Sequence, residues 1–144
     1  MTSPEQVQLP ENKDVRILIV DDDPIVLEVM KSFIDSFGYN FETALDGVEA
    51  IEHLKKHFFS IIITDINMPR MDGMELLKYA NEHYPKSGVI VVTGFSEEYS
   101  YMDVINAGAI DYMTKPLQGD ELLAKLRRVI REQTLMQGLE ELSI

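Results

Sequence analysis

Short apolar runs alternate along the chain with longer segments in which apolar residues recur every three or four positions. The short runs have the length of single β-strands, and most are rich in Ile and Val; we expect strands at 16–20, 40–44, 60–64, 88–93 and 109–113. The segments between them have the period of amphipathic helices, which predicts helices at 24–37, 47–57, 74–84, 97–107 and from about 120 onward.

Residues with strong capping and turn preferences mark the borders of these segments. Asp23 precedes Pro24, the usual order of an N-cap and a first helical residue, and Gly38 follows the end of the same helix. Five strands that alternate with five helices indicate an α/β fold with a parallel sheet. Because five such units are too few for a closed eightfold barrel, we predict an open, doubly wound five-stranded parallel sheet.

The regular pattern does not extend over the whole chain. Residues 1–14 are polar, contain Pro4 and Pro10 and show no period, so we expect a flexible N-terminal lead-in. One folded domain is expected at 15–131. Residues 132–144 keep a thinner apolar pattern that fits either a helical extension or a frayed tail, and the sequence leaves both open.

Composition narrows the classes of function. The chain of 144 residues carries 25 acidic and 13 basic residues, a net charge of −12, which disfavours binding of nucleic acid by this chain. It has no Cys, so disulfides, thiolate nucleophiles and thiolate metal sites are excluded. The sequence contains neither an apolar run long enough to span a bilayer nor a signal-peptide pattern near its start. We therefore expect a cytoplasmic protein with no membrane partner.

Charged and hydroxyl side chains follow the predicted strands, where ligands of open parallel sheets bind. Asp21 and Asp22 follow the first strand, Asp65 the third, Thr93 ends the fourth, and Lys115 follows the fifth. Neighbouring carboxylates repel one another unless a cation neutralises them, and their hard oxygen ligands suit Mg²⁺. A lysine and a hydroxyl at the same edge suit phosphoryl oxygens. A carboxylate nucleophile, a metal and a lysine together indicate an aspartyl-phosphate site.

Four motifs in this order resemble the receiver domain of two-component response regulators. They are ILIVDDDP (17–24), DINMPRMDG (65–73), VTG (92–94) and KPL (115–117), and the similarity covers residues 16 to about 131. The resemblance implies the flavodoxin-like form of the predicted sheet, with strand order 2-1-3-4-5 and five helices.

The resemblance also implies a role for each acidic position. Asp65 would accept a phosphoryl group from a histidine kinase or a histidine phosphotransfer protein. Asp22 would bind Mg²⁺ directly, together with Asp65 and the backbone carbonyl of Asn67, while Asp21 would act largely through water.

Further roles fall on the ends of the fourth and fifth strands. Lys115 would pair with phosphoryl oxygens, and its bond to Pro116 is expected to be cis. Thr93 would bind a phosphoryl oxygen, and Tyr112 would change rotamer with it, reshaping the surface of the fourth helix, fifth strand and fifth helix. Phe95 is bulky and apolar where many receivers carry a polar residue, so we expect a phosphoryl group that is not unusually short-lived.

The sequence therefore predicts a phosphorylation-driven switch whose surface is read by an output domain or a separate protein. Apart from its own phosphorylation and dephosphorylation, we expect no catalysis on a separate substrate. One alternative is a receiver-like adaptor that works without phosphorylation. A second is a phosphotransferase of the haloacid-dehalogenase type, which would need an Asp two residues after the nucleophile, where this chain has Asn67.

Overall fold

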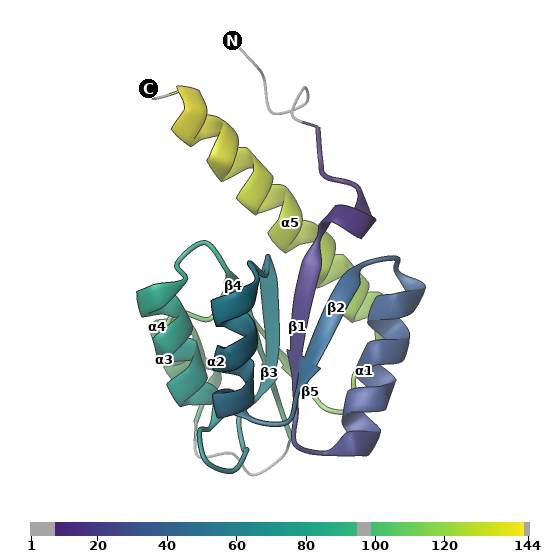
Figure 1. The fold of residues 1–144 in the computed structure, drawn as a ribbon, viewed down its shortest axis with the longest axis vertical. Helices are drawn as coiled ribbons and strands as arrows, with labels where there is room; N and C mark the ends of the chain where they lie inside the picture. The colour runs from purple at the N-terminus through teal and green to yellow at the C-terminus, as the bar shows by residue number, and fades with distance from the viewer. Residues whose placement is uncertain (1–7, 95–98, 143–144) are drawn as a thin grey trace.

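Five parallel strands form one sheet in the order β2-β1-β3-β4-β5 (Figure 1). The computed structural model describes residues 8–94 and 99–142. The strands are β1 (Arg16–Val20), β2 (Asn40–Ala44), β3 (Ile61–Asp65), β4 (Gly88–Thr93) and β5 (Asp111–Thr114). The helices are α1 (Pro24–Ser36), α2 (Gly47–Lys56), α3 (Gly73–His83), α4 (Tyr101–Asn106) and α5 (Gly119–Leu142), with a short 3₁₀ helix η2 (Asn12–Asp14) before β1. The predicted fold class and strand order are confirmed.

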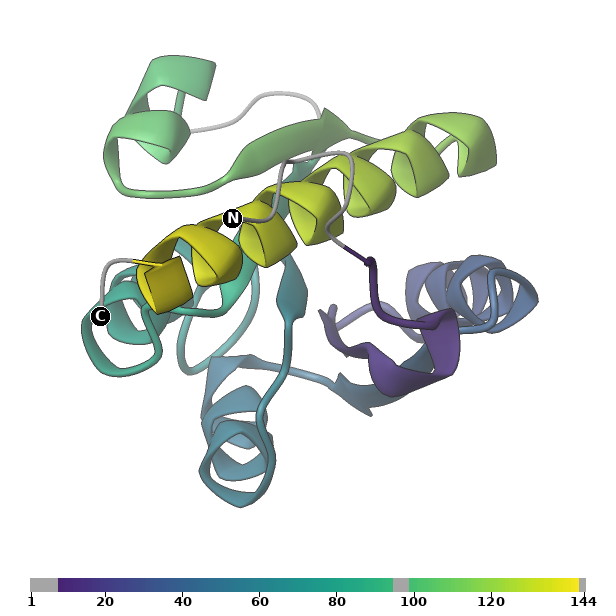
Figure 2. The same ribbon diagram turned by 90° about the horizontal axis from the view of Figure 1, so that it is seen from above.

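The central strands β1, β3 and β4 are buried along almost their whole length because helices cover both faces of the sheet. Ile17 and Ile19 of β1 pack on the side of α1 and α5, whereas Leu18 and Val20 pack on the side of α2 and α3. Figure 2 shows α1 and α2 on opposite sides of the strands. Both cores are therefore built on the same strands, which fixes where the strand ends lie relative to the helices.

Side-chain caps fix where the helices begin at the carboxyl edge of the sheet. Asp23 accepts a hydrogen bond from the Ile25 amide at 2.9 Å, which confirms its predicted role as the N-cap of α1. Asp46 caps α2 by accepting from the Glu49 amide at 2.8 Å. Since an N-cap is an extended residue between two elements, each cap sets the direction in which the chain leaves its strand.

Two predicted borders, the starts of α4 and β5, differ from the structure by two residues or more. The helix expected at 97–107 is α4, which begins at Tyr101, because Ser100 and Asp103 form a capping box there. Its predicted first residues, 97 and 98, lie outside the described residues. The strand expected at 109–113 is β5, from Asp111 to Thr114, because the Ala109 amide still donates to Val104 in the turn that ends α4.

The last helix is longer than the body of the domain requires. Helix α5 continues through residues 132–142, and its final turns extend past the amino-terminal edge of the sheet (Figure 1). Met136, Leu139 and Leu142 are exposed on these turns. Among the described helices, none has the combination of length and hydropathy that crossing a bilayer requires.

Candidate functional site

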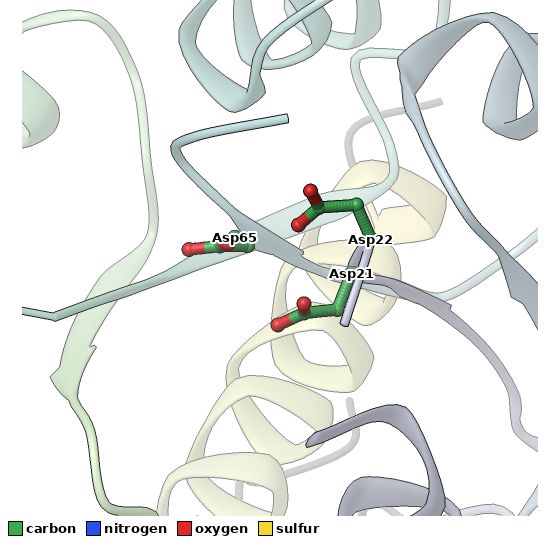
Figure 3. A group of neighbouring side chains, drawn as sticks. All are labelled: Asp21, Asp22 and Asp65. Carbon is green, nitrogen blue, oxygen red and sulfur yellow. The ribbon is translucent and has the colours of Figure 1, made fainter. Parts of the chain in front are cut away.

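Three aspartates meet where β1 and β3 end. Asp21 and Asp22 follow β1, and Asp65 is the last residue of β3. The two strands are neighbours, with Val20 beside Thr64, so the residues that follow them are brought together. One carboxylate oxygen from each aspartate lies within 4.8 Å of the others, and Figure 3 shows the three side chains extending to the same side. We call these three residues the acidic cluster.

Lys115 reaches the acidic cluster from the end of β5. Its Nζ lies 3.2 Å from Oδ2 of Asp21 and 3.3 Å from Oδ2 of Asp65. Its backbone amide donates to the Thr93 carbonyl at 2.8 Å, and its peptide bond to Pro116 is cis. One ammonium group is therefore shared by two buried carboxylates.

The charges of this site do not balance. Three carboxylates face one ammonium group, and burial together with the charge of Asp21 raises the pKa of Asp65 to about 6, although Lys115 opposes this rise. Burial also raises the pKa of Asp21. Burial would lower the pKa of Lys115, but the carboxylates of Asp65 and Asp21 outweigh it and raise that pKa. At neutral pH the site thus holds more negative charge than its own residues neutralise.

The donor atoms of the acidic cluster fit a small divalent cation. All three are carboxylate oxygens, the hard ligands that such cations prefer. Oδ2 of Asp21 is buried, and within the described part of the chain it is held by its ion pair with Lys115. Asp22 is exposed, and it leaves one side of the cluster open to solvent. Asn67 lies two residues past Asp65, in the β3–α3 loop (residues 66–72).

The two other predicted residues, Thr93 and Tyr112, have different surroundings. Thr93 ends β4 at the same edge, is fully buried, and its hydroxyl donates to the Gly94 carbonyl at 3.4 Å. Tyr112 lies on β5 and packs edge-on against Tyr101 of α4, with ring centroids 5.5 Å apart. Thr93 therefore belongs to the edge with the acidic cluster, while Tyr112 contacts the neighbouring helix. Phe95 lies outside the described residues.

One contact beside the site has no counterpart among the sequence predictions. Arg70 of the β3–α3 loop donates to the carboxylate of Asp46, the cap of α2. Asp46 is recognisable from the sequence as a residue that begins a helix, but no local pattern pairs it with a side chain 24 positions later.

Comparison with known proteins matches residues 17–127 to the response regulator receiver domain. The transcriptional regulatory protein DltR of Streptococcus agalactiae (strain NEM316) is 30% identical over 124 residues, which cover 86% of this chain and 55% of DltR. The response regulator MprA of Mycobacterium ulcerans is 36% identical over 121 residues, covering 84% of this chain and 52% of MprA. This chain spans about half the length of these relatives.

Solved structures agree with this match. A CheY-like response regulator receiver domain protein from Methanospirillum hungatei JF-1 is 36% identical, with a TM-score of 0.77 over 83% of this chain and 95% of that one. The signal receiver domain of an HD domain-containing protein from Pseudomonas fluorescens Pf-5 is 26% identical, with a TM-score of 0.82 over 90% of this chain and 96% of that one. The chain belongs to the family of response regulator receiver domains.

Proposed function

We propose that this chain is the phosphoacceptor of a two-component phosphorelay, in which Asp65 takes a phosphoryl group from a histidine kinase or a histidine phosphotransfer protein. The observation that carries this proposal is the placement of Asp65 within ion-pair distance of Lys115 and beside two further carboxylates. A buried strand-end carboxylate with an adjacent ammonium group has the parts that phosphoryl transfer to an acid requires.

The transfer itself needs few groups from the protein. A carboxylate oxygen of Asp65 forms a bond to phosphorus while the phosphorus–nitrogen bond of the phosphohistidine breaks, and the imidazole keeps the electron pair. Lys115 would neutralise charge on the transferred oxygens. Since the pKa of Asp65 is about 6, the carboxylate is ionised at neutral pH and can act as the nucleophile. Water attack on phosphorus later releases phosphate and restores the carboxylate.

A Mg²⁺ ion fits the acidic cluster. Asp22 and Asp65 would hold it directly, with the backbone carbonyl of Asn67, and Asp21 would contact it through water. When bound, the ion would neutralise the negative charge shared by the carboxylates and the phosphoryl group. The excess negative charge at Asp21 and Asp65 supports a divalent rather than a monovalent cation.

The signal would leave the site through β4 and β5. Thr93 would bind a phosphoryl oxygen, and its carbonyl already accepts from the Lys115 amide. Tyr112 sits on β5 against Tyr101 of α4, so a change at the strand ends would alter the surface of α4, β5 and α5. An output domain or a separate protein would read this surface in the cytoplasm. We propose no reaction on a separate substrate and no nucleic-acid contact by this chain.

Intact-protein mass spectrometry tests the proposal. Incubation with acetyl phosphate and Mg²⁺ should add one phosphoryl group to the wild-type chain, and the adduct should be lost in alkali. Asp65→Asn should abolish the gain, whereas Asp35→Asn, which changes an exposed aspartate of α1, should keep it. A folded wild-type protein that gains nothing would instead support an adaptor that works without phosphorylation.

A further inference from the structure

Asp46 uses both carboxylate oxygens to join two segments that are distant in the sequence. Its Oδ1 accepts from the Glu49 amide at 2.8 Å and so caps α2. Its Oδ2 accepts from Nε of Arg70 at 2.8 Å, and Nη2 of Arg70 lies 2.7 Å from the same oxygen. Burial would raise the pKa of Asp46, but the Glu49 amide and the guanidinium of Arg70 outweigh it and lower that pKa. Asp46 is thus a fully compensated buried charge.

Arg70 stands at a strained point of the β3–α3 loop. Its φ is +65°, a conformation that non-glycine residues seldom adopt. The Met71 amide donates across it to the Pro69 carbonyl at 2.8 Å, which closes a three-residue turn of the rarer, positive-φ type. Such a turn persists only where surrounding contacts hold it, and the two bonds from Arg70 to Asp46 are contacts of this kind.

Backbone hydrogen bonds tie the rest of the β3–α3 loop to the first residues of α3 and α2. The Gly73 amide donates to the Ile66 carbonyl at 2.7 Å, and the Gly47 amide donates to the Met71 carbonyl at 3.2 Å. A Cβ atom at Gly47 would lie only 2.6 Å from Cγ of Met71, so the loop lies directly on the first turn of α2. Asn67 therefore belongs to a loop, β3–α3, whose conformation depends on its contacts with α2.

We propose that Arg70 is a positioning residue for the phosphorylation site: its ion pair with Asp46 holds the β3–α3 loop so that the backbone at Asn67 is preorganised to bind Mg²⁺. This inference rests on the proposed function, since it assigns Arg70 to the metal site of the same reaction. Within the described part of the chain, Arg70 makes its ion pair with Asp46 and none with the acidic cluster, so it would act through the loop. Preorganised ligands bind a metal more tightly because less order must be imposed on binding.

If the Arg70–Asp46 ion pair only stabilised the fold, its loss would leave Mg²⁺ binding unchanged. The Arg70 side chain is 60% exposed, and exposed ion pairs contribute little to stability. A purely electrostatic effect would also have a distinct sign: loss of the positive Arg70 would tighten cation binding, whereas loss of the negative Asp46 would weaken it. Positioning predicts that either loss weakens cation binding.

Isothermal titration calorimetry with Mg²⁺ alone, at fixed ionic strength, distinguishes these cases. The variants are Arg70→Gly, which accepts the positive φ without strain, and Asp46→Asn, whose amide oxygen can still cap α2. We expect each to raise the Kd for Mg²⁺ about three- to tenfold, and the double variant to be no weaker than the weaker single one. Phosphorylation by acetyl phosphate at saturating Mg²⁺ should stay within about twofold of wild type, and circular dichroism should show each variant folded.

The outcomes separate the two proposals. If wild type binds Mg²⁺ and is phosphorylated while both variants keep its Kd, the role of Arg70 is wrong and the proposed function stands. Tighter binding by Arg70→Gly would replace positioning with electrostatics. If the wild type binds no Mg²⁺ at all, both the metal site and the role of Arg70 are overturned.

Discussion

Two groups of buried aspartates lie at the carboxyl edge of the same sheet, and their pKa values shift in opposite directions. Asp21 and Asp65 share Lys115, and burial raises the pKa of both. Asp46, two residues after β2, has a similarly small exposed fraction but lies closer to the molecular surface, and its pKa is lowered. It has a guanidinium group of its own and a helix amide on its other oxygen.

Compensation by charged and hydrogen-bonding partners, together with shallower burial at Asp46, accounts for this difference. A carboxylate whose two oxygens are both satisfied stabilises the fold and has no need of a further cation. Two carboxylates that share one ammonium group keep a net negative charge. This charge can bind a metal cation, which in turn can accommodate a phosphoryl group. Charge balance thus separates the structural aspartate from those for which we propose a function, although all of them lie at or shortly after the end of a strand.

Removing the ammonium group of Lys115, which Asp21 and Asp65 share, should have the largest effect on stability. Lys115→Met leaves Asp21 and Asp65 facing each other, and we expect a loss of about 3 kcal/mol in the free energy of unfolding at pH 7.5 without metal. Lys115 lowers the pKa of both acids, so these pKa values rise further in the variant. The loss should therefore shrink as the pH falls toward 5 and the acids take up protons.

Urea denaturation followed by circular dichroism measures this loss, because the chain has no Trp for fluorescence. Lys31→Met is the matched control: Lys31 pairs with Glu28 on the surface of α1 at 3.0 Å, and its removal should cost less than about 0.5 kcal/mol. Equal losses for the two lysines would mean that the acidic cluster is not under repulsion.

Removing one of the shared carboxylates should have the opposite sign. Asp65→Asn should stabilise the metal-free protein by about 2 kcal/mol at pH 7.5, since the rise in the Asp65 pKa from 3.8 to about 6 sets an upper limit of about 3 kcal/mol. An acid whose pKa is raised by folding destabilises the fold when ionised. The gain should therefore be complete above pH 6 and vanish toward pH 4.

Thermal unfolding at several pH values tests this sign. A gain that stays constant between pH 7.5 and 4.5 would show that the Asn amide improves packing and that charge is not the cause. A Tm below that of wild type at pH 7.5 would contradict the raised pKa of Asp65.

The sheet and the strand-end residues could be predicted because their signals are local. Residues 17–20 of β1 are apolar on both faces of the sheet, and parallel strands bring their carboxyl ends to one edge wherever they occur in the sequence. The predicted start of α4 is wrong because the sequence offers more than one place for a helix to begin. The capping box of Ser100 and Asp103 selects Tyr101 as the first helical residue. Arg70 could not be assigned, since its partner is defined by how the β3–α3 loop packs on α2 and not by spacing.

Substitution of Asp46, whose charge is compensated, should have the smallest effect on the free energy of unfolding, and its pH dependence should differ from that of Asp65. Asp46→Ala removes the cap of α2 and leaves Arg70 in solvent, which should cost about 1 kcal/mol, whereas Asp46→Asn keeps a cap and should cost about half as much. Because the pKa of Asp46 is lowered by folding, its contribution is complete above pH 3.8 and is lost only as the pH falls through the lower, folded value. In urea titrations the cost of Asp46→Ala should therefore stay level between pH 7.5 and 5, whereas the gain from Asp65→Asn declines below about pH 6. A cost that declined in parallel with that gain would mean that Asp46 titrates with the acidic cluster, and the division between structural and functional aspartates would fail.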